Sequence, residues 1–165
     1  TKFALGVCNG CQMMSQLREI IPGSVHWPYF KKNHSEQFEA RLANVKINPS
    51  SSILFHGMEN SILPIVVSHA EGKTHRQEKH SDLSQAATIL QYVDYHGEVT
   101  ERYPYNPNGS HQGETAFCNE DGRITIMMPH PERTIKTAQM SWAPQSWGEQ
   151  APWIQLFYNA RQWVG

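Results

Sequence analysis

The clearest fold signal in this chain is Phe3-Ala4-Leu5-Gly6-Val7-Cys8-Asn9-Gly10-Cys11-Gln12. An apolar run typical of a strand leads into a Gly-x-Cys-x-Gly turn, and a helix is predicted to follow. This pattern is the cysteine form of the nucleophile elbow, in which a sharp strand-to-helix turn lifts a reactive side chain above a sheet. Gly6 and Gly10 lie two residues to either side of Cys8, where side chains are expected to crowd the tight turn.

The start of the predicted helix gathers groups suited to nucleophilic chemistry. Cys8 is expected at the amino end, whose partial positive charge favours a thiolate over a thiol. The backbone amide of Asn9 lies at the same end, so it is placed to donate to an oxyanion that develops beside the sulfur. Gln12 follows Cys8 by four residues, which puts both on one face of a helix. We therefore predict that Gln12 contacts whatever Cys8 attacks.

A second motif, His130-Pro131-Glu132, supplies a base and a carboxylate. It follows the apolar run Ile124–Met128, which predicts a buried strand. In an extended backbone His130 and Glu132 point to the same side, and the flanking prolines stiffen that geometry. A carboxylate beside an imidazole fixes its tautomer and favours the imidazolium that a thiolate partner needs. The sequence thus predicts a triad of Cys8, His130 and Glu132.

Together the two motifs resemble those of class I glutamine amidotransferases of the triad type. Within that superfamily, further strings look like the phosphoribosylformylglycinamidine synthases of de novo purine biosynthesis, in their long single-chain form. The resemblance covers essentially the whole chain. It rests on Cys8-Asn9-Gly10-Cys11-Gln12, Ser68-His69-Ala70-Glu71-Gly72, Asn106-Pro107-Asn108-Gly109-Ser110, Met128-Pro129-His130-Pro131-Glu132-Arg133 and the Trp-rich tail from Ser141 to Trp153.

This resemblance implies an α/β fold: a flavodoxin-like or Rossmann-like open sheet with a nucleophile elbow and a β-rich later part. It implies glutamine as the substrate, hydrolysed through a cysteine thioester to supply ammonia. Ser68 and His69 then border the glutamine pocket together with Asn9 and Gln12. No metal or cofactor is expected within the chain itself. ATP and magnesium are expected in a synthetase domain of the same polypeptide, which converts formylglycinamide ribonucleotide to formylglycinamidine ribonucleotide.

The resemblance also bears on domain organisation. Members of this family carry a Rossmann-like half before the elbow, with a glycine-rich loop that donates the other oxyanion-hole amide. The present chain opens at Thr1, directly in the elbow strand. We therefore expect residues 1–165 to form the carboxyl-terminal part of a glutaminase domain that lacks its amino-terminal half. Partners are then glutamine and the synthetase domain.

Composition excludes several classes of protein. A length of 165 residues is enough for a single core. The net charge of −1 and the isoelectric point of about 6.7 give no electrostatic case for binding nucleic acid or an anionic membrane. No apolar stretch approaches the roughly 20 residues that a membrane helix needs. Three cysteines fit a reducing compartment better than a disulfide scaffold, so we expect a cytoplasmic location.

Hydrophobic patterning predicts an alternation of helices and strands that becomes β-rich. Pro64 favours the start of a strand or an edge strand for its segment. Ser81 is placed to cap one of the helices. The predicted strands are Lys2–Val7, Phe38–Ile47, Ile62–Ser68, Ile89–Val93, Gly97–Thr100, Thr115–Cys118 and Arg123–Met128, and the predicted helices are Gly10–Glu19, Asp82–Ala87 and Trp153–Trp163.

Several motifs have simpler interpretations. Cys8 and Cys11 form a Cys-x-x-Cys that also suits a redox pair or half of a zinc site, but no second Cys-x-x-Cys exists and Cys118 stands alone. Cys11 is then a small helix residue packed near the sheet. His69 and Glu71 repeat the spacing of an imidazole–carboxylate pair, although a polar strand end explains them equally well.

Two other functions stay open at this level. One is a different Cys-His-Glu hydrolase, of peptidase or γ-glutamyl type, although Gln12 and the purine-type strings argue against it. The other is a non-catalytic interaction module in which the triad persists without function.

Overall fold

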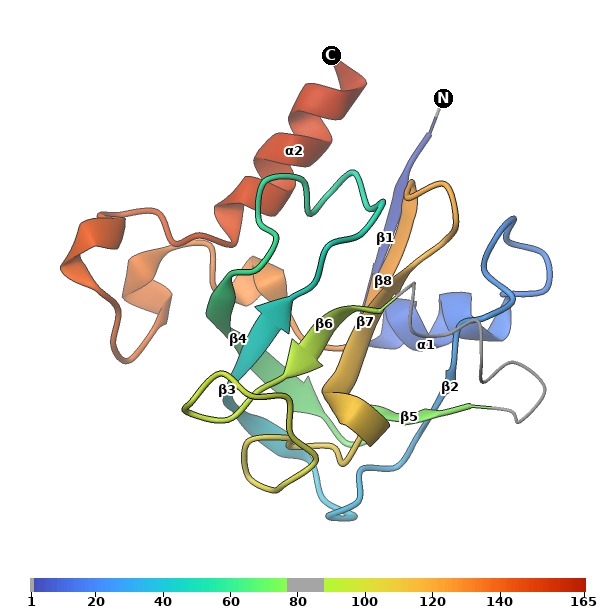
Figure 1. Ribbon diagram of the computed structural model, residues 1–165, viewed down its shortest axis with the longest axis horizontal. Helices are drawn as coiled ribbons and strands as arrows, with labels where there is room; N and C mark the ends of the chain where they lie inside the picture. Colours follow the sequence, from blue (N-terminus) through green and yellow to red (C-terminus); the bar gives the residue numbers. More distant parts are fainter. Residues whose placement is uncertain (1, 77–87) are drawn as a thin grey trace.

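The computed structural model describes residues 2–76 and 88–165, and its centre is a curled six-stranded sheet in the order β1-β8-β7-β6-β3-β4 (Figure 1). A small second sheet pairs β2 (Tyr29–Lys31) with β5 (Lys73–His75). The strands of the main sheet are β1 (Ala4–Val7), β3 (Glu39–Ile47), β4 (Ile62–His69), β6 (Thr88–Tyr92), β7 (Glu114–Cys118) and β8 (Ile124–Met127).

The helices are few and short. Helix α1 (Asn9–Gln16) follows the first strand, and helix α2 (Ile154–Val164) closes the chain. Single 3₁₀ turns connect other elements, at His111–Gly113, Pro131–Arg133, Thr137–Gln139 and Gln145–Trp147. No helix in the described part of the chain is both long and apolar enough to span a bilayer.

Strands β1 and β8 run parallel, whereas the other strand pairs described in this sheet are antiparallel. In their register Val7 lies opposite Met127. Because parallel strands end at the same edge of a sheet, the residues that follow β1 and β8 emerge side by side. The elbow and the His-Pro-Glu motif are those residues.

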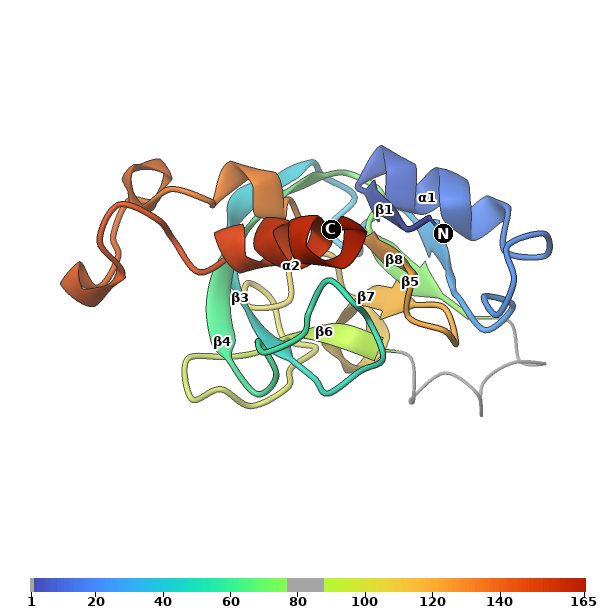
Figure 2. The same cartoon turned by 90° about the horizontal axis from the view of Figure 1, so that it is seen from above.

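The two α-helices lie on opposite faces of the curled sheet, with α2 inside its concave face and α1 outside (Figure 2). The alternation along β8 shows this arrangement. Met127 packs in the larger cluster with Leu156 of α2, while Ile126 and Met128 pack in the smaller cluster with Cys11 of α1. Successive residues of a strand point to opposite faces, so β8 supports both helices at once.

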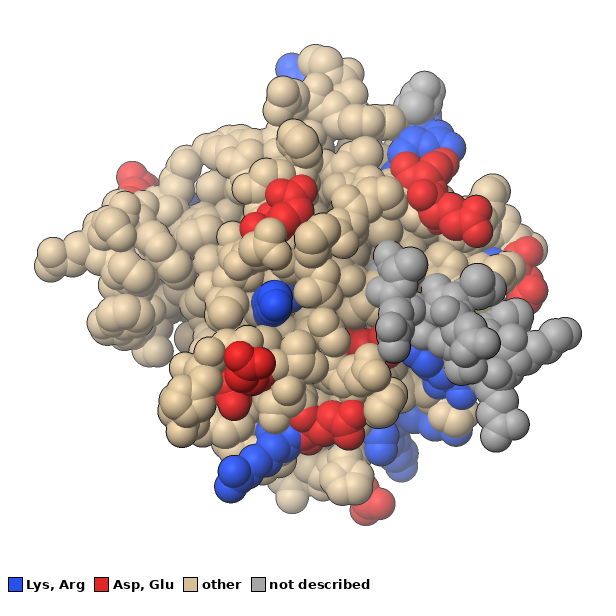
Figure 3. Space-filling view, viewed as in Figure 1, with Lys and Arg blue, Asp and Glu red and all other residues tan. Residues whose placement is uncertain are grey.

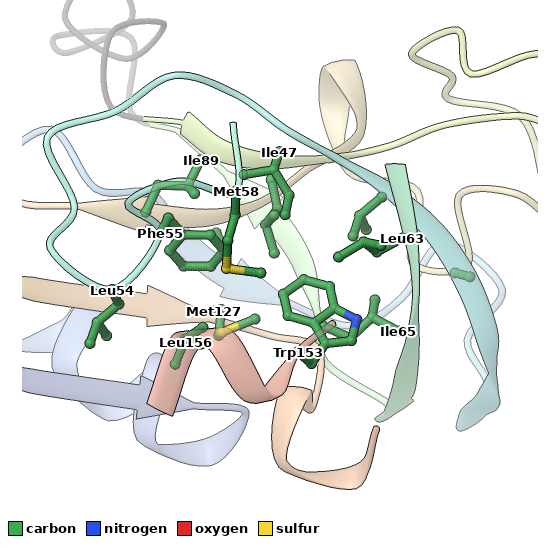
Figure 4. Packing of buried hydrophobic residues seen from close by; sticks show 14 of the residues in the cluster. Ile47, Leu54, Phe55, Met58, Leu63, Ile65, Ile89, Met127, Trp153 and Leu156 are labelled. Atoms are coloured by element: carbon green, nitrogen blue, oxygen red, sulfur yellow. The ribbon is translucent and has the colours of Figure 1, made fainter. Parts of the chain in front are cut away.

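The concave core is filled by large apolar side chains around the start of α2 (Figure 4). Trp153 is fully buried, packs edge-on against Phe55, and donates its indole N–H to the carbonyl of Pro64 at 2.7 Å. Pro64 lies on β4, an edge strand of the sheet, which confirms the position predicted for it. Further members of this cluster are Ile47, Leu54, Met58, Leu63, Ile65, Ile89, Met127 and Leu156.

The secondary structure confirms most of the predicted elements and corrects three. The strand predicted at Gly97–Thr100 is wrong, since Val99 forms only an isolated bridge with Val93. The first helix ends at Gln16 rather than Glu19. The pairing of β2 with β5 is not among the predicted elements. The helix predicted over Asp82–Ala87 with its cap at Ser81 lies outside the described residues.

The elbow has the strained backbone expected of it. Cys8 has φ 52° and ψ −108°, a conformation that L-residues adopt rarely and only where the surroundings enforce it. A Cβ added to Gly6 would lie 2.6 Å from Met14 Sδ and 2.8 Å from the Gly10 carbonyl oxygen. A Cβ at Gly10 would meet no neighbouring group within 4 Å, so the expected crowding holds for Gly6 and is wrong for Gly10.

Because of these contacts, alanine substitution at the two glycines is expected to change the stability of the fold differently. We expect Gly6→Ala to lower the free energy of unfolding by roughly 1–3 kcal/mol, because the methyl group forces the helix away from the strand. Gly10→Ala should leave it unchanged or raise it by up to about 1 kcal/mol, since alanine favours helix and has room. Urea unfolding of both variants measures this difference, and equal losses would contradict it.

Candidate active site

The predicted triad assembles at the edge of the sheet where β1 and β8 end. The backbone N–H of Cys8 donates to the carbonyl of Met127 at 2.9 Å, which continues the parallel ladder by one step. The backbone N–H of His130 donates to the carbonyl of Val66 on β4 at 2.8 Å. Two different strands therefore fix the backbones of the nucleophile and the base.

His130 and Glu132 form the imidazole–carboxylate pair that the sequence predicts. Nδ1 of His130 lies 2.7 Å from Oε1 of Glu132. The expectation that both side chains project from an extended backbone is wrong, because Pro131–Arg133 form a 3₁₀ turn that brings the carboxylate around to the ring. The Glu132 side chain is 44% exposed, whereas that of His130 is 9% exposed, so the pair opens to solvent on the carboxylate side.

The opposite ring nitrogen of His130 is directed at the nucleophile. Nε2 is buried and makes no hydrogen bond of standard geometry with the described residues. Interaction with the Cys8 side chain is nevertheless the largest cause that raises the pKa of His130, opposed by burial and supported by the hydrogen bond and charge of Glu132. Cys8 and Glu132 thus both favour the protonated form of His130.

Asn9 and Gln12 occupy the first turn of α1 beside Cys8. Asn9 is exposed and is the first helical residue, so its N–H has no partner within the helix. The backbone N–H of Gln12 donates to the Cys8 carbonyl at 3.0 Å, and its side-chain Nε2 donates to the carbonyl of Glu71 at 2.6 Å. Gln12 thus ties the helix to the segment after β4, while its predicted contact with substrate stays a prediction.

Ser68 and His69 lie at the end of β4, next to the elbow. The thiol of Cys8 points to the carbonyl of Ser68, with 3.8 Å between sulfur and oxygen. His69 is buried, and its Nε2 lies 3.3 Å from Nδ2 of Asn108. The alternative pairing of His69 with Glu71 is not what the structure shows, because the described hydrogen bond of the ring is to Asn108.

Two residues near the site make contacts that the sequence does not predict. Asn33 and Asn108 are both buried and hydrogen-bond to the segment after β4. The composition of Asn106–Ser110 indicates only a turn-rich loop, and Asn33 belongs to no motif. Neither local pattern carries a signal for such contacts, because each partner lies more than 30 residues away in the chain.

The remaining cysteines do not form a second chemical site. Cys11 is fully buried among apolar residues of α1 and β8, and burial raises the pKa of its thiol well above the usual value. This confirms a packing role and disfavours the thiolate that a redox pair with Cys8 would require. Within residues 2–76 and 88–165, no group of three or more His, Cys, Asp or Glu side chains is arranged to hold a metal ion.

Comparisons with known proteins identify the family and the fold of this chain. The family model described as a CobB/CobQ-like glutamine amidotransferase domain matches residues 1–164. The structure of PurLQS from Thermotoga maritima superimposes with a TM-score of 0.69 at 17% identity, over 98% of this chain and 61% of that one. A putative GMP synthase subunit from Thermoplasma acidophilum gives a TM-score of 0.51 at 12% identity, over 97% of this chain and 59% of that one.

At these identities the two structures show a shared fold, and the chain spans about three-fifths of the length of each. Membership rests on the family model, which covers nearly every residue. The chain therefore belongs to the CobB/CobQ-like glutamine amidotransferase domain family.

Proposed function

We propose that this chain is the ammonia-generating part of a phosphoribosylformylglycinamidine synthase. One observation supports the proposal: β1 and β8 pair in parallel, so Cys8 and His130 follow strands that end at the same edge of the sheet, and Nδ1 of His130 lies 2.7 Å from Oε1 of Glu132. A nucleophile, a base and an orienting carboxylate in that order are the requirements for hydrolysing an amide through a thioester.

The reaction begins with proton transfer from the Cys8 thiol to Nε2 of His130. The thiolate then attacks the side-chain amide carbon of glutamine and forms a carbon–sulfur bond. The resulting oxyanion is stabilised by the N–H of Asn9 and by a second donor that the resemblance places outside residues 1–165. Glu132 supports this step, because a carboxylate on Nδ1 stabilises the imidazolium that forms.

Collapse of the tetrahedral intermediate breaks the carbon–nitrogen bond. His130 returns its proton to the departing nitrogen, so that ammonia leaves and a glutamyl thioester remains on Cys8. His130 then takes a proton from water, which attacks the thioester and releases glutamate. The thiol is regenerated, and the histidine ends in its initial state.

The purine assignment is supported by the sequence strings and by the shared fold with PurLQS. In this proposal, ammonia passes to a synthetase site in the same polypeptide, where ATP and magnesium serve the conversion of formylglycinamide ribonucleotide in the cytoplasm. Enclosure matters, because ammonia released to water becomes ammonium, which has no free electron pair for attack.

Charges of both signs are dispersed over the face in Figure 3, and the proposal assigns this domain no nucleic-acid partner.

The division of labour between two sites leads to a direct test. We expect Cys8→Ala in the full-length enzyme to abolish synthesis with glutamine while synthesis with added ammonia persists. His130→Ala should behave in the same way, and Glu132→Ala should lose less, because it orients the base without reacting. Steady-state rates with each nitrogen donor decide the matter, and equal loss of both activities would refute the assignment.

The contacts of His130 predict how its titration responds to mutation. Cys8→Ala and Glu132→Gln should each lower its pKa, because both partners raise it in the wild type. NMR titration of the imidazole measures these shifts. A raised pKa in the folded state also means that His130 stabilises the fold below its unfolded pKa of about 6.5 and loses this contribution as pH rises through the folded value. An unchanged pKa in both variants would contradict the described geometry.

A further inference from the structure

The segment Ser68–Gly72 is a wall of the triad that is hydrogen-bonded along its length. On the side of the nucleophile, its first carbonyl accepts the Cys8 thiol and the carbonyl of Glu71 accepts Nε2 of Gln12 at 2.6 Å. Both donors belong to the elbow and its helix. The position of this segment therefore bears directly on where the sulfur and Gln12 lie.

The far side of the segment is fastened by Asn33. Its Nδ2 donates to the carbonyl of His69 at 2.8 Å, and its Oδ1 accepts the N–H of Gly72 at 2.9 Å. Its own backbone N–H donates to the carbonyl of Ala70 at 2.8 Å. A single residue, through its side chain and its backbone, thus holds three parts of the wall.

Asn108 is a second support of this segment and is fully buried. Its Nδ2 donates to the carbonyl of Gly72 at 2.8 Å and faces Nε2 of His69 at 3.3 Å. Its Oδ1 accepts both the backbone N–H and the hydroxyl of Ser110, at 3.0 and 2.7 Å. A backbone N–H only donates and a carbonyl only accepts, so these partners fix which way the amide points.

The orientation of the amide in turn fixes the protonation of His69. Because Nδ2 of Asn108 can only donate, Nε2 of His69 must accept, and the ring carries its proton on Nδ1. Burial lowers the pKa of His69 to about 4, the charge of His130 acts in the same direction, and the carbonyl of Met128 opposes both. The ring thus lies neutral between Asn108 and the strand end that leads into His130.

Gly72 shows how closely this ring is packed. A Cβ at this position would lie 2.1 Å from Nε2 of His69, a distance that the ring cannot accommodate in place. The absence of a side chain at Gly72 therefore leaves room for the His69 ring that Asn108 faces.

We propose that Asn108 is a positioning residue for the glutaminase reaction: it holds Gly72 and the His69 ring so that the wall keeps its place against Cys8 and the base. This inference rests on the proposed function of the triad. Asn108 touches neither Cys8 nor His130 in the described contacts, so its influence passes through the wall. Displacement of a positioned group by about 1 Å can cost on the order of 100-fold in rate.

The test compares Asn108→Ala with Asn159→Ala in the full-length enzyme. Asn159 is a matched control, because it is also buried and donates Nδ2 to two backbone carbonyls, those of Leu54 and His56, away from the triad. We expect Asn108→Ala to lower kcat/KM for glutamine by about tenfold or more, with ammonia-dependent synthesis unchanged. Asn159→Ala should lower Tm to a similar extent and leave both activities within about twofold of wild type.

Ser110→Ala provides a second, smaller perturbation in case Asn108→Ala does not fold. It removes the hydroxyl that orients the Asn108 amide while the backbone N–H of residue 110 remains. We expect a smaller loss of kcat/KM in the same direction, again without loss of ammonia-dependent synthesis. A wild-type rate in Ser110→Ala, when Asn108→Ala is insoluble, would overturn the positioning role.

The remaining outcomes separate the two proposals. Equal effects of Asn108→Ala and Asn159→Ala on glutaminase, at equal Tm, would show that Asn108 only stabilises the fold and would overturn the inference. If the wild-type enzyme hydrolyses glutamine no faster than Cys8→Ala, the proposed function itself fails, and the positioning role falls with it.

Discussion

The parallel pairing of β1 with β8 is the constraint on which the site depends. These strands are far apart in sequence, and each is followed by one half of the triad. Parallel strands share an edge at their carboxyl ends, so the register between Val7 and Met127 sets the separation of Cys8 and His130. A slip of one residue would turn each side chain of β8 to the other face of the sheet and disrupt the packing of both hydrophobic clusters. The packing of both clusters against β8 thus helps to fix the relative positions of Cys8 and His130.

Much of this arrangement could be predicted from the sequence because its signals are local. The pattern that predicts the elbow lies within ten consecutive residues. The edge position of β4 follows from Pro64, which has no N–H to donate to a neighbouring strand. The pairing of His130 with Glu132 was predicted correctly from a spacing of two, although the backbone reaches it through a 3₁₀ turn. Short spacing limits the distance between two side chains more strongly than it determines the path between them.

Other features could not be predicted because they arise from contacts across the fold. The sheet of β2 and β5 has three residues in each strand, too few for a period of two to be recognised. Asn33 acts through single hydrogen bonds to a segment far along the chain, and one polar residue in a loop has no pattern of its own. The prediction of crowding at Gly10 is wrong because the two glycines, although equally spaced from Cys8 in the sequence, lie in different structures. Gly6 is in a strand and Gly10 is in a helix.

The strained backbone of Cys8 has a consequence for the history of such domains. With φ at 52° and ψ at −108°, this position suits glycine better than any residue with a side chain, and strain of this kind costs on the order of 1–3 kcal/mol. A copy of the gene released from selection for catalysis would therefore gain robustness by exchanging its nucleophile for glycine. Glycine at this bend in a relative would indicate a domain that has lost its catalytic activity and kept its fold.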